Sequence, residues 1–381
     1  SEMCIRDSPK TSYLTWETIA TWNIGLDMSF LNSRLNFTGD YFIRDTEGML
    51  AKSYVLPSVF GAKEPKENCA DLRTKGWELS LNWNDSFALM GKRFNYTVSA
   101  SLGDNKTVIT KYNNPEKLLT DYYEGMVLGE IWGYRIDGLF ASDEEATEYT
   151  SKINQDFVNA RILSDKVDPY YRAGDLKFRD LDNNNVINKG DDTVYDPGDR
   201  EIIGNETPRY NYSFRLGADW NGFDLGIFFQ GVGKRDWYPN HLSTGFWGPY
   251  SRAFTSFIPE NFMDQCWSEE NPGGYFPRFR GYQTFKDSQL GVNNDRYLQN
   301  ASYIRLKNLT VGYTLPVLKK VFTKLRVYFT GENLWYWSPM KKYTKYIDPE
   351  AAGGNGNTGM AYNYSRNFSV GVDLSLIHIS E

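Results

Sequence analysis

The sequence predicts an all-β fold, a transmembrane wall of antiparallel strands with lipid on one face and water on the other. Three observations predict it. The ordered segments alternate apolar and polar residues, as in Leu325–Thr330, and consecutive side chains of a strand point to opposite faces. Their connections alternate between short and long, which is typical of outer-membrane barrels. The chain has no run of about 18 apolar residues, so a helical membrane span is excluded.

The composition narrows the class of protein further. Of the 381 residues, 16% are aromatic, yet the mean hydropathy is −0.56. Many aromatic residues in a polar chain suit a barrel with interfacial aromatic girdles, or a carbohydrate-binding surface. The net charge of −6 gives no sign of nucleic-acid binding. Three scattered cysteines and two histidines fit neither a disulfide framework nor a zinc site nor histidine-based catalysis, so we expect no enzyme.

About nine strands are expected, arranged mainly as hairpins. The first hairpin turns tightly at Leu31–Arg34, and the second has a short link at 85–92. A long connection, 45–75, separates the two hairpins and is expected to hold a short strand at Ser53–Phe60. In chain order the predicted strands cover residues 21–30, 35–43, 77–83, 94–102, 210–220, 223–229, 303–313, 325–330 and 368–374.

The third hairpin gives the strongest local signal. Asn221 and Gly222 stand between two alternating runs, and both residue types tolerate the positive φ that a two-residue hairpin turn requires. The strand at 303–313 is less regular, because its apolar phase slips between Leu306 and Leu309. A β-bulge would explain the slip, as would an upper half that stands clear of the membrane, and the sequence leaves both open.

Three further connections are longer still, at residues 103–209, 232–302 and 334–366, and are called below the first, second and third long connections. Structureless loops of this length are uncommon, so internal structure and a task are expected of them. Within the first connection, Ser142 and Glu145 form a capping-box pattern. This pattern predicts the start of a short helix.

Seven segments, taken together, resemble one known family. They are TWETIATWNIGLDMSF (15–30), LRTKGWELSLNW (72–83), GEIWGYRIDGLFASDEE (129–145), GDLKFRDLDNNNVIN (174–188), IIGNETPRYNYSFRLGADWNGFDLGIFFQG (202–231), NASYIRLKNLTVGYTLP (300–316) and LRVYFTGENLWYWS (325–338). In these segments the chain resembles the C-terminal part of the SusC/RagA-type TonB-dependent transporters of Bacteroidetes. The resemblance places the chain in the bacterial outer membrane.

The resemblance also implies a fold, partners and a function. A family barrel of 22 strands encloses a plug, so this chain is expected to supply the C-terminal portion, with short periplasmic turns and long extracellular loops. TonB would act through the plug, which lies outside this chain, and a SusD-like lipoprotein would close the extracellular mouth. The implied function is import of a large nutrient, with an oligosaccharide favoured. The alternative is a passive porin, or a surface glycan-binding barrel without energised transport.

Both ends of the chain fit their neighbours poorly. Residues 1–8 and 376–381 look like translated sequencing-adapter sequence, so the barrel portion is expected to span residues 9–375. Family members end their last strand in an aromatic residue, and Leu376 stands at that place here. The native end is therefore expected to be missing.

Aromatic residues of the second long connection form the first candidate site. Trp237, Tyr238, Trp247 and Tyr250 are predicted to stack on the sugar rings of a glycan. Loop–loop packing and a place in an interfacial girdle are the alternatives. For the run Trp335–Trp337, which directly follows a strand, the girdle is the favoured interpretation.

An oxygen-rich run in the first long connection forms the second candidate site. Its spacing is that of an EF-hand-like loop, with Asp180, Asp182 and Asn184 at the first, third and fifth positions, the carbonyl of Val186 at the seventh, and Asp191 at the twelfth. The run therefore predicts a structural Ca²⁺ site. The alternative is an Asx-rich turn without a metal. No other cofactor is expected.

Overall fold

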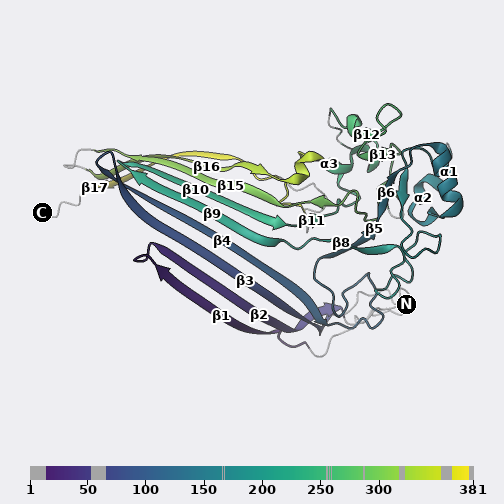
Figure 1. Ribbon diagram of the computed structural model, residues 1–381, viewed down its shortest axis with the longest axis horizontal. Coiled ribbons are helices and arrows are strands. Elements are labelled where there is room, and N and C mark those ends of the chain that lie inside the picture. Colours follow the sequence, from purple (N-terminus) through teal and green to yellow (C-terminus); the bar gives the residue numbers. More distant parts are fainter. Residues whose placement is uncertain are drawn as a thin grey trace, which may run out of the picture.

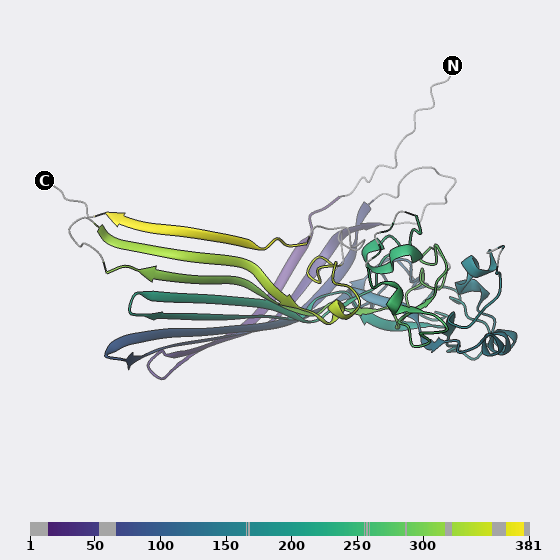
Figure 2. The same cartoon turned by 90° about the horizontal axis from the view of Figure 1, so that it is seen from above.

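The computed structural model describes residues 14–52, 66–316, 322–352 and 363–376, apart from positions 165, 167, 255, 257, 259, 286 and 287. Long strands fill one half of the molecule and folded loops fill the other (Figure 1). The strands form one antiparallel sheet in the order β1-β2-β3-β4-β9-β10-β15-β16-β17, which is visibly curved in Figure 2. They are β1 (Thr18–Phe30), β2 (Leu35–Lys52), β3 (Lys66–Leu89), β4 (Lys92–Lys111), β9 (Arg209–Trp220), β10 (Phe223–Lys234), β15 (Tyr303–Thr314), β16 (Phe322–Trp337) and β17 (Asn367–Leu376).

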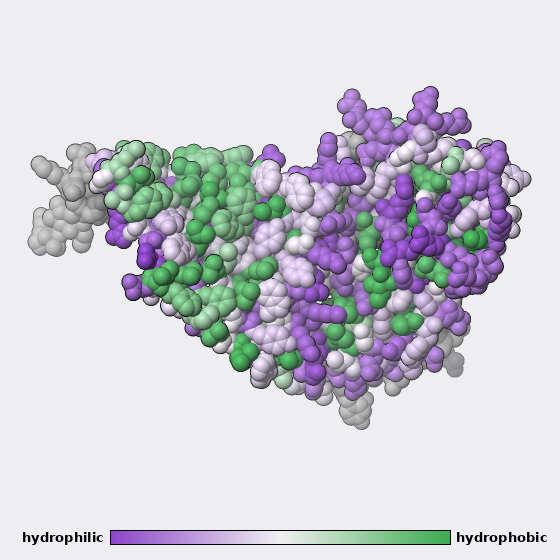
Figure 3. All heavy atoms as spheres, viewed as in Figure 1, coloured by the Kyte–Doolittle hydropathy of each residue, from purple (hydrophilic) through white to green (hydrophobic). Residues whose placement is uncertain are grey.

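The register of the sheet gives it one apolar face and one polar face. Leu26, Gly39, Leu79, Leu102 and Tyr212 are paired in turn from β1 to β9, so they share the face that we call outward. Apolar side chains gather over the strand half of the molecule, whereas the loop half is mainly hydrophilic (Figure 3). The alternation predicted from the sequence is confirmed.

The hairpin turns depend on residues in the left-handed region. Asn221 and Gly222 have φ of 50° and 89°, as the predicted two-residue turn requires. Leu31, Asn32 and Ser33 all have φ between 54° and 61°. The predicted link at 85–92 is shorter than expected, because β3 continues to Leu89 and only Met90 and Gly91 form the turn.

The connection expected at 45–75 is largely strand. β2 continues to Lys52 and β3 begins at Lys66, because the two strands stay paired from Leu35 and Trp83 to Lys52 and Lys66, through bulges near Met49. The sequence-based boundary was wrong, since polar residues stand on both faces of these outer ends and interrupt the alternation. The short strand expected at Ser53–Phe60 lies outside the described residues.

The phase slip in β15 is a β-bulge. Phe228 of β10 pairs with Asn308 and Phe229 pairs with Leu306, so Lys307 is the extra residue. β16 has a matching irregularity, where Asn333 has a φ of 52°. The bulge keeps apolar side chains outward on both sides of Lys307, and the first of the two explanations left open is the right one.

The loop half contains short helices and small two-stranded sheets. Among the described residues, no helix combines the length and the apolar character needed to cross a membrane. The first long connection holds β5 (Glu130–Tyr134), β6 (Ile136–Leu139), α1 (Asp143–Lys152), η2 (Asp156–Val158), α2 (Ala160–Leu163), β7 (Leu176–Phe178) and β8 (Arg200–Asn205). The second holds β11 (Asp236–Trp237), α3 (Thr244–Trp247), η3 (Gly248–Tyr250), η4 (Met263–Gln265), β12 (Cys266–Trp267), β13 (Phe276–Arg278) and β14 (Gln299–Asn300), and the third holds η5 (Pro339–Lys342).

The predicted start of α1 is confirmed. Ser142 is the N-cap, and its Oγ accepts a hydrogen bond from the backbone N–H of Glu145 at 3.2 Å. The Glu145 carboxylate accepts in return from the N–H of Ala141 at 2.7 Å. Two N–H groups at the helix start are satisfied in this way.

Candidate functional site

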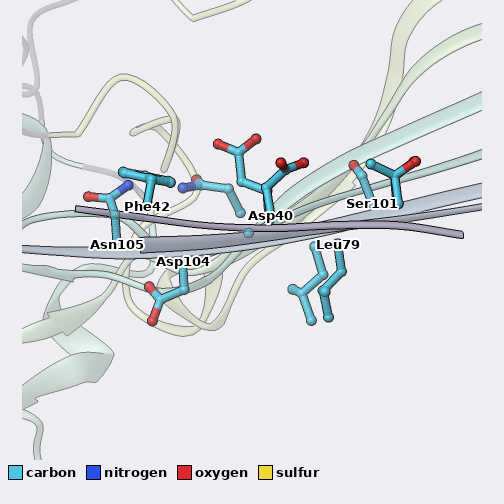
Figure 4. Close-up of a pocket in the computed structure, with 12 residues that line it drawn as sticks. Asp40, Phe42, Leu79, Ser101, Asp104 and Asn105 are labelled. Atoms are coloured by element: carbon cyan, nitrogen blue, oxygen red, sulfur yellow. The ribbon is translucent and has the colours of Figure 1, made fainter. Parts of the chain in front are cut away.

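The polar face of the sheet forms one part of the site. In Figure 4, Asp40, Phe42, Ser101 and Asn105 lie on one side of the strands, while Leu79 and Asp104 lie on the other. A hollow of about 400 Å³ on this part of the wall is lined by hydroxyl, amide and carboxylate groups, among them those of Thr38, Asp40, Glu78, Ser80, Ser101, Asn105 and Asn211. This face offers hydrogen bonds to a polar solute rather than an apolar cavity.

The three long connections form a second part, which we call the mouth domain (residues 112–208, 235–302 and 338–352). They share one buried core with members in each connection, such as Phe178, Trp247 and Met340. Tyr275 of the second connection stacks on Tyr343 of the third, with ring centres 3.5 Å apart and planes inclined by 7°. The connections therefore fold together as one unit.

Buried ion pairs join the parts of the mouth domain. Asp175 is fully buried and binds the guanidinium of Arg280 at 3.2 Å, which ties the first connection to the second. Burial raises the pKa of the Asp175 carboxyl, and Arg280 acts in the opposite direction. Arg305 of β15 is also buried and binds Asp348, which anchors the third connection to the wall.

The structure places the four aromatic residues predicted to stack on sugars inside this core. Trp247 and Tyr250 have no exposed surface, and Trp237 and Tyr238 retain 2% and 9%. The Trp247 indole donates to the carbonyl of Pro239 at 3.2 Å, and the Tyr250 hydroxyl donates to that of Pro277 at 2.6 Å. In this conformation Trp247 and Tyr250 pack the loops. Trp237 and Tyr238 also pack in this core, but their small remaining surface borders a cavity beside it. Trp335 and Trp337, in contrast, are about half exposed on the outward face, as a girdle requires.

A groove beside that core offers more exposed surface, and Trp237 and Tyr238 form part of its lining. Two cavities of about 350 and 370 Å³ share Trp132, Arg200 and Asn293, and a third of about 410 Å³ continues past Asn293. We call this the mouth groove. Trp132 is half-buried and Phe157 is 37% exposed. Aromatic, cationic and amide groups lie together here. Only Trp132 falls within one of the segments that resemble the family, and Phe157, Arg200 and Asn293 were missed by the sequence analysis.

The oxygen-rich run gathers a carboxylate cluster, but with one different member. Ligand oxygens of Asp180, Asp182 and Asp199 all lie within 4.8 Å of one another. Asp191, predicted at the twelfth position, is exposed and outside the cluster. Residues 189–198 loop out and carry Asp191 away from the cluster. The N–H of Asn188 donates to the Asp199 carboxylate at 2.8 Å, and the backbone N–H of Asp199 donates to the carbonyl of Asn188.

The other two predicted ligands, Asn184 and Val186, form hydrogen bonds with neighbouring residues. The amide nitrogen of Asn184 donates to Asp182 at 2.8 Å, and the carbonyl of Val186 accepts from the side chain of Asn188 at 3.0 Å. Burial raises the pKa of Asp199, and the charges of Asp182 and Asp180 raise it further. Three hard oxygen donors in mutual repulsion fit a Ca²⁺ ion chemically.

Comparisons with known proteins extend this description. The family model described as TonB dependent receptor-like, beta-barrel matches residues 7–334. The chain is 28% identical over 379 residues to TonB-dependent receptor P3 of Formosa agariphila, covering 94% of this chain and 33% of that protein. It is 24% identical to TonB-dependent receptor SusC of Bacteroides thetaiotaomicron, covering 90% and 30%. The chain thus spans about a third of the length of these curated relatives.

A solved structure shares the fold. The RagAB peptide transporter superposes with a TM-score of 0.65 at 22% identity, and the match covers 95% of this chain and 36% of that one. At this identity the likeness concerns the fold alone. It agrees with the nine-stranded curved sheet and its long connections at one end.

Proposed function

Because the chain belongs to the TonB-dependent receptor-like β-barrel family, we propose that it forms part of the wall and the extracellular mouth of an energised outer-membrane importer of a large nutrient. Members of this family are transport receptors and not enzymes, so binding and passage are the steps to examine. The outward apolar face meets lipid, and the polar face lines the path of the solute. TonB would act through a plug outside this chain.

The observation that carries the proposal is the co-folded mouth domain. Long loops are entropically expensive to order, yet here they share a core, buried ion pairs and a stacked tyrosine pair. A passive water-filled pore does not require its loops to be ordered in this way. Ordered loops are needed where a binding site must hold a ligand in a fixed geometry.

We favour an oligosaccharide as the nutrient, with the mouth groove, whose lining includes Trp237 and Tyr238, as its contact. Half-exposed Trp132 and Phe157 offer ring faces for stacking, and Arg200, Asn293, Glu130 and Glu206 offer hydrogen bonds to hydroxyl groups. One solved relative is described as a peptide transporter. Peptide and glycan are therefore compared directly in the test below.

A SusD-like lipoprotein is the proposed partner at the mouth. The second long connection exposes large apolar side chains, with Phe254 89% and Met263 57% exposed. Exposed apolar groups of this size on a folded surface are typical of protein contacts. They support a partner on this side of the mouth domain.

A Ca²⁺ ion held by Asp180, Asp182 and Asp199 is the proposed structural metal. It would neutralise three carboxylates and fix the return of the chain into β8, which begins at Arg200 beside the groove. Asn184 and Val186 would join the ligand set after small rotations. Asp191 is not included.

Uptake by cells tests the proposal. A strain that lacks the full-length gene is complemented with the gene, and uptake of fluorescent oligosaccharides and peptides of matched mass is measured with and without a protonophore. Energised import predicts oligosaccharide uptake that depends on both the gene and the proton gradient. Uptake insensitive to the protonophore would favour a passive porin, and surface binding without uptake would favour a glycan-binding barrel.

A further inference from the structure

Two lysines stand opposite each other on the outward face of the wall. Lys75 of β3 pairs with Lys106 of β4, and both are exposed. By strand alternation they lie on the same side as Leu79 and Asp104, which point away from the polar face in Figure 4. Like charges directly opposite on neighbouring strands destabilise a sheet. An anionic ligand would offset that repulsion.

The carboxylates beside this lysine pair are already engaged. Asp45 accepts hydrogen bonds from Arg73 at 2.6 and 3.1 Å. Asp104 accepts from both Nε and Nη2 of Arg209. The described side chains on this face therefore leave a net positive charge at Lys75 and Lys106.

The position of the pair along β3 places it at the membrane boundary. Toward the turn, the next outward residues are Trp77, Leu79, Leu81 and Trp83, and then Asp85, which pairs with Arg34 at 3.2 Å. Lys75 precedes Asp85 by ten residues, or about 33 Å along the strand at about 3.3 Å per residue. A strand tilt of about 40° reduces this to about 25 Å, the height of the apolar band of an outer-membrane barrel.

The charged residues at the two limits therefore bracket the hydrocarbon layer. Lys75 and Lys106 lie on the loop side, which is the extracellular side in this family. Tyr41 and Trp77, paired with each other one step closer to the turns, are the aromatic residues expected at the interface. The lysine pair lies at the level of lipid headgroups.

We propose that Lys75 and Lys106 bind a phosphate group of a phosphorylated glycolipid in the outer leaflet. A flexible ammonium group suits phosphate as a point charge, and two of them on opposed residues can hold one phosphate between them. The apolar face directly below the pair accommodates the acyl chains. The inference goes beyond nutrient import, since it concerns the outer surface of the wall and not the path of the solute.

Native mass spectrometry of the full-length barrel in detergent tests this site, with lipid A as the phosphorylated probe and phosphatidylethanolamine as the zwitterionic comparison. Each lysine near an anionic headgroup layer contributes to the affinity for anionic lipid. Lys75→Gln/Lys106→Gln is therefore expected to weaken lipid A retention by about tenfold or more. Retention of phosphatidylethanolamine is expected to stay unchanged. Lys75→Arg/Lys106→Arg keeps both charges and is expected to retain lipid A.

A matched control removes the same charge elsewhere. Lys152→Gln/Lys345→Gln changes two exposed lysines of the mouth domain and is expected to leave lipid A retention intact. Heat-modifiability on gels verifies that each variant is folded. The proposal is overturned if the folded Lys75→Gln/Lys106→Gln variant keeps its lipid A, if both lipids are lost equally, or if millimolar inorganic phosphate displaces lipid A. Nutrient uptake is measured separately, so a failure of the import proposal leaves this result interpretable.

Discussion

Asp224 of β10 and Arg326 of β16 form a bidentate ion pair across the strand that separates them, with Nε–Oδ2 and Nη2–Oδ1 distances of 2.7 and 2.6 Å. The intervening strand, β15, has Gly312 at this level. A Cβ atom there would lie 2.4 Å from Asp224 and 2.6 Å from Arg326. Arg326 also binds Asp373 of β17 at 2.9 Å. One guanidinium thus links the last strands of the sheet because the residue beneath it has no side chain.

Gly312→Val is therefore expected to separate Asp224 from Arg326 and to lower the stability of the barrel. The branched side chain occupies the space of the ion pair, and overpacking of this kind costs about 1–3 kcal/mol. The temperature of heat-modification on gels should fall. Gly226→Ala is the control, because its Cβ would meet only Thr310, at 4.0 Å. Equal behaviour of the two variants would show that the ion pair adjusts without loss.

The wall illustrates how far sequence reasoning reaches. Alternation fixes which face each residue takes, so hairpin turns such as Asn221-Gly222 and the slip beside Lys307 could be read directly. The ends of the strands could not be predicted in this way. The outer part of β3 has Arg73 and Lys75 on its outward face, so the apolar half of the alternation is missing there. The sequence pattern thus predicts the features that neighbouring residues determine, such as turns and bulges.

The mouth domain illustrates where such reasoning stops. Counting along an EF-hand-like loop selected Asp191, whereas the chain loops out between Asn188 and Asp199 and brings back a different carboxylate. The aromatic residues were recognised but not their burial, because the core that covers Trp247 comes from several connections far apart in the chain. Contacts between residues far apart in the chain leave no periodic pattern in the sequence.

Asp348→Asn is expected to loosen the third connection from the wall. Arg305 and Asp348 are 1% and 2% exposed at their side chains, and loss of one charge from a fully buried pair costs about 3–5 kcal/mol. Glu350 remains 3.0 Å from Nε of Arg305, so the cost is expected to lie at or below the lower end of that range. Hydrogen exchange should rise in residues 338–352. Glu148→Gln breaks the exposed pair with Lys152 and is expected to change stability by less than about 0.5 kcal/mol. Unchanged exchange in the Asp348→Asn protein would contradict the anchoring role.

The two possible calcium ligand sets make opposite predictions. If the folded cluster holds the ion, Asp199→Asn should abolish the heat of Ca²⁺ binding in calorimetric titration, because one of three carboxylates is lost. Asp191→Asn should leave the titration unchanged. The reverse result would support the ligand spacing read from the sequence, and absence of heat in the unsubstituted protein would reduce the run to an Asx-rich turn.

Trp247→Ala and Trp132→Ala separate packing from binding in the mouth domain. Trp247 is fully buried among Phe246, Phe276 and Tyr297, so its removal should destabilise the mouth domain by about 3–5 kcal/mol. Limited proteolysis of the loops should accelerate accordingly. Trp132 borders the mouth groove and is half-buried, so its removal should leave proteolysis nearly unchanged. It should instead weaken binding of an imported oligosaccharide roughly fivefold, the value of about one stacking contact. If Trp247→Ala lost binding but kept its protease resistance, the buried aromatic residues would be shown to contact the ligand directly.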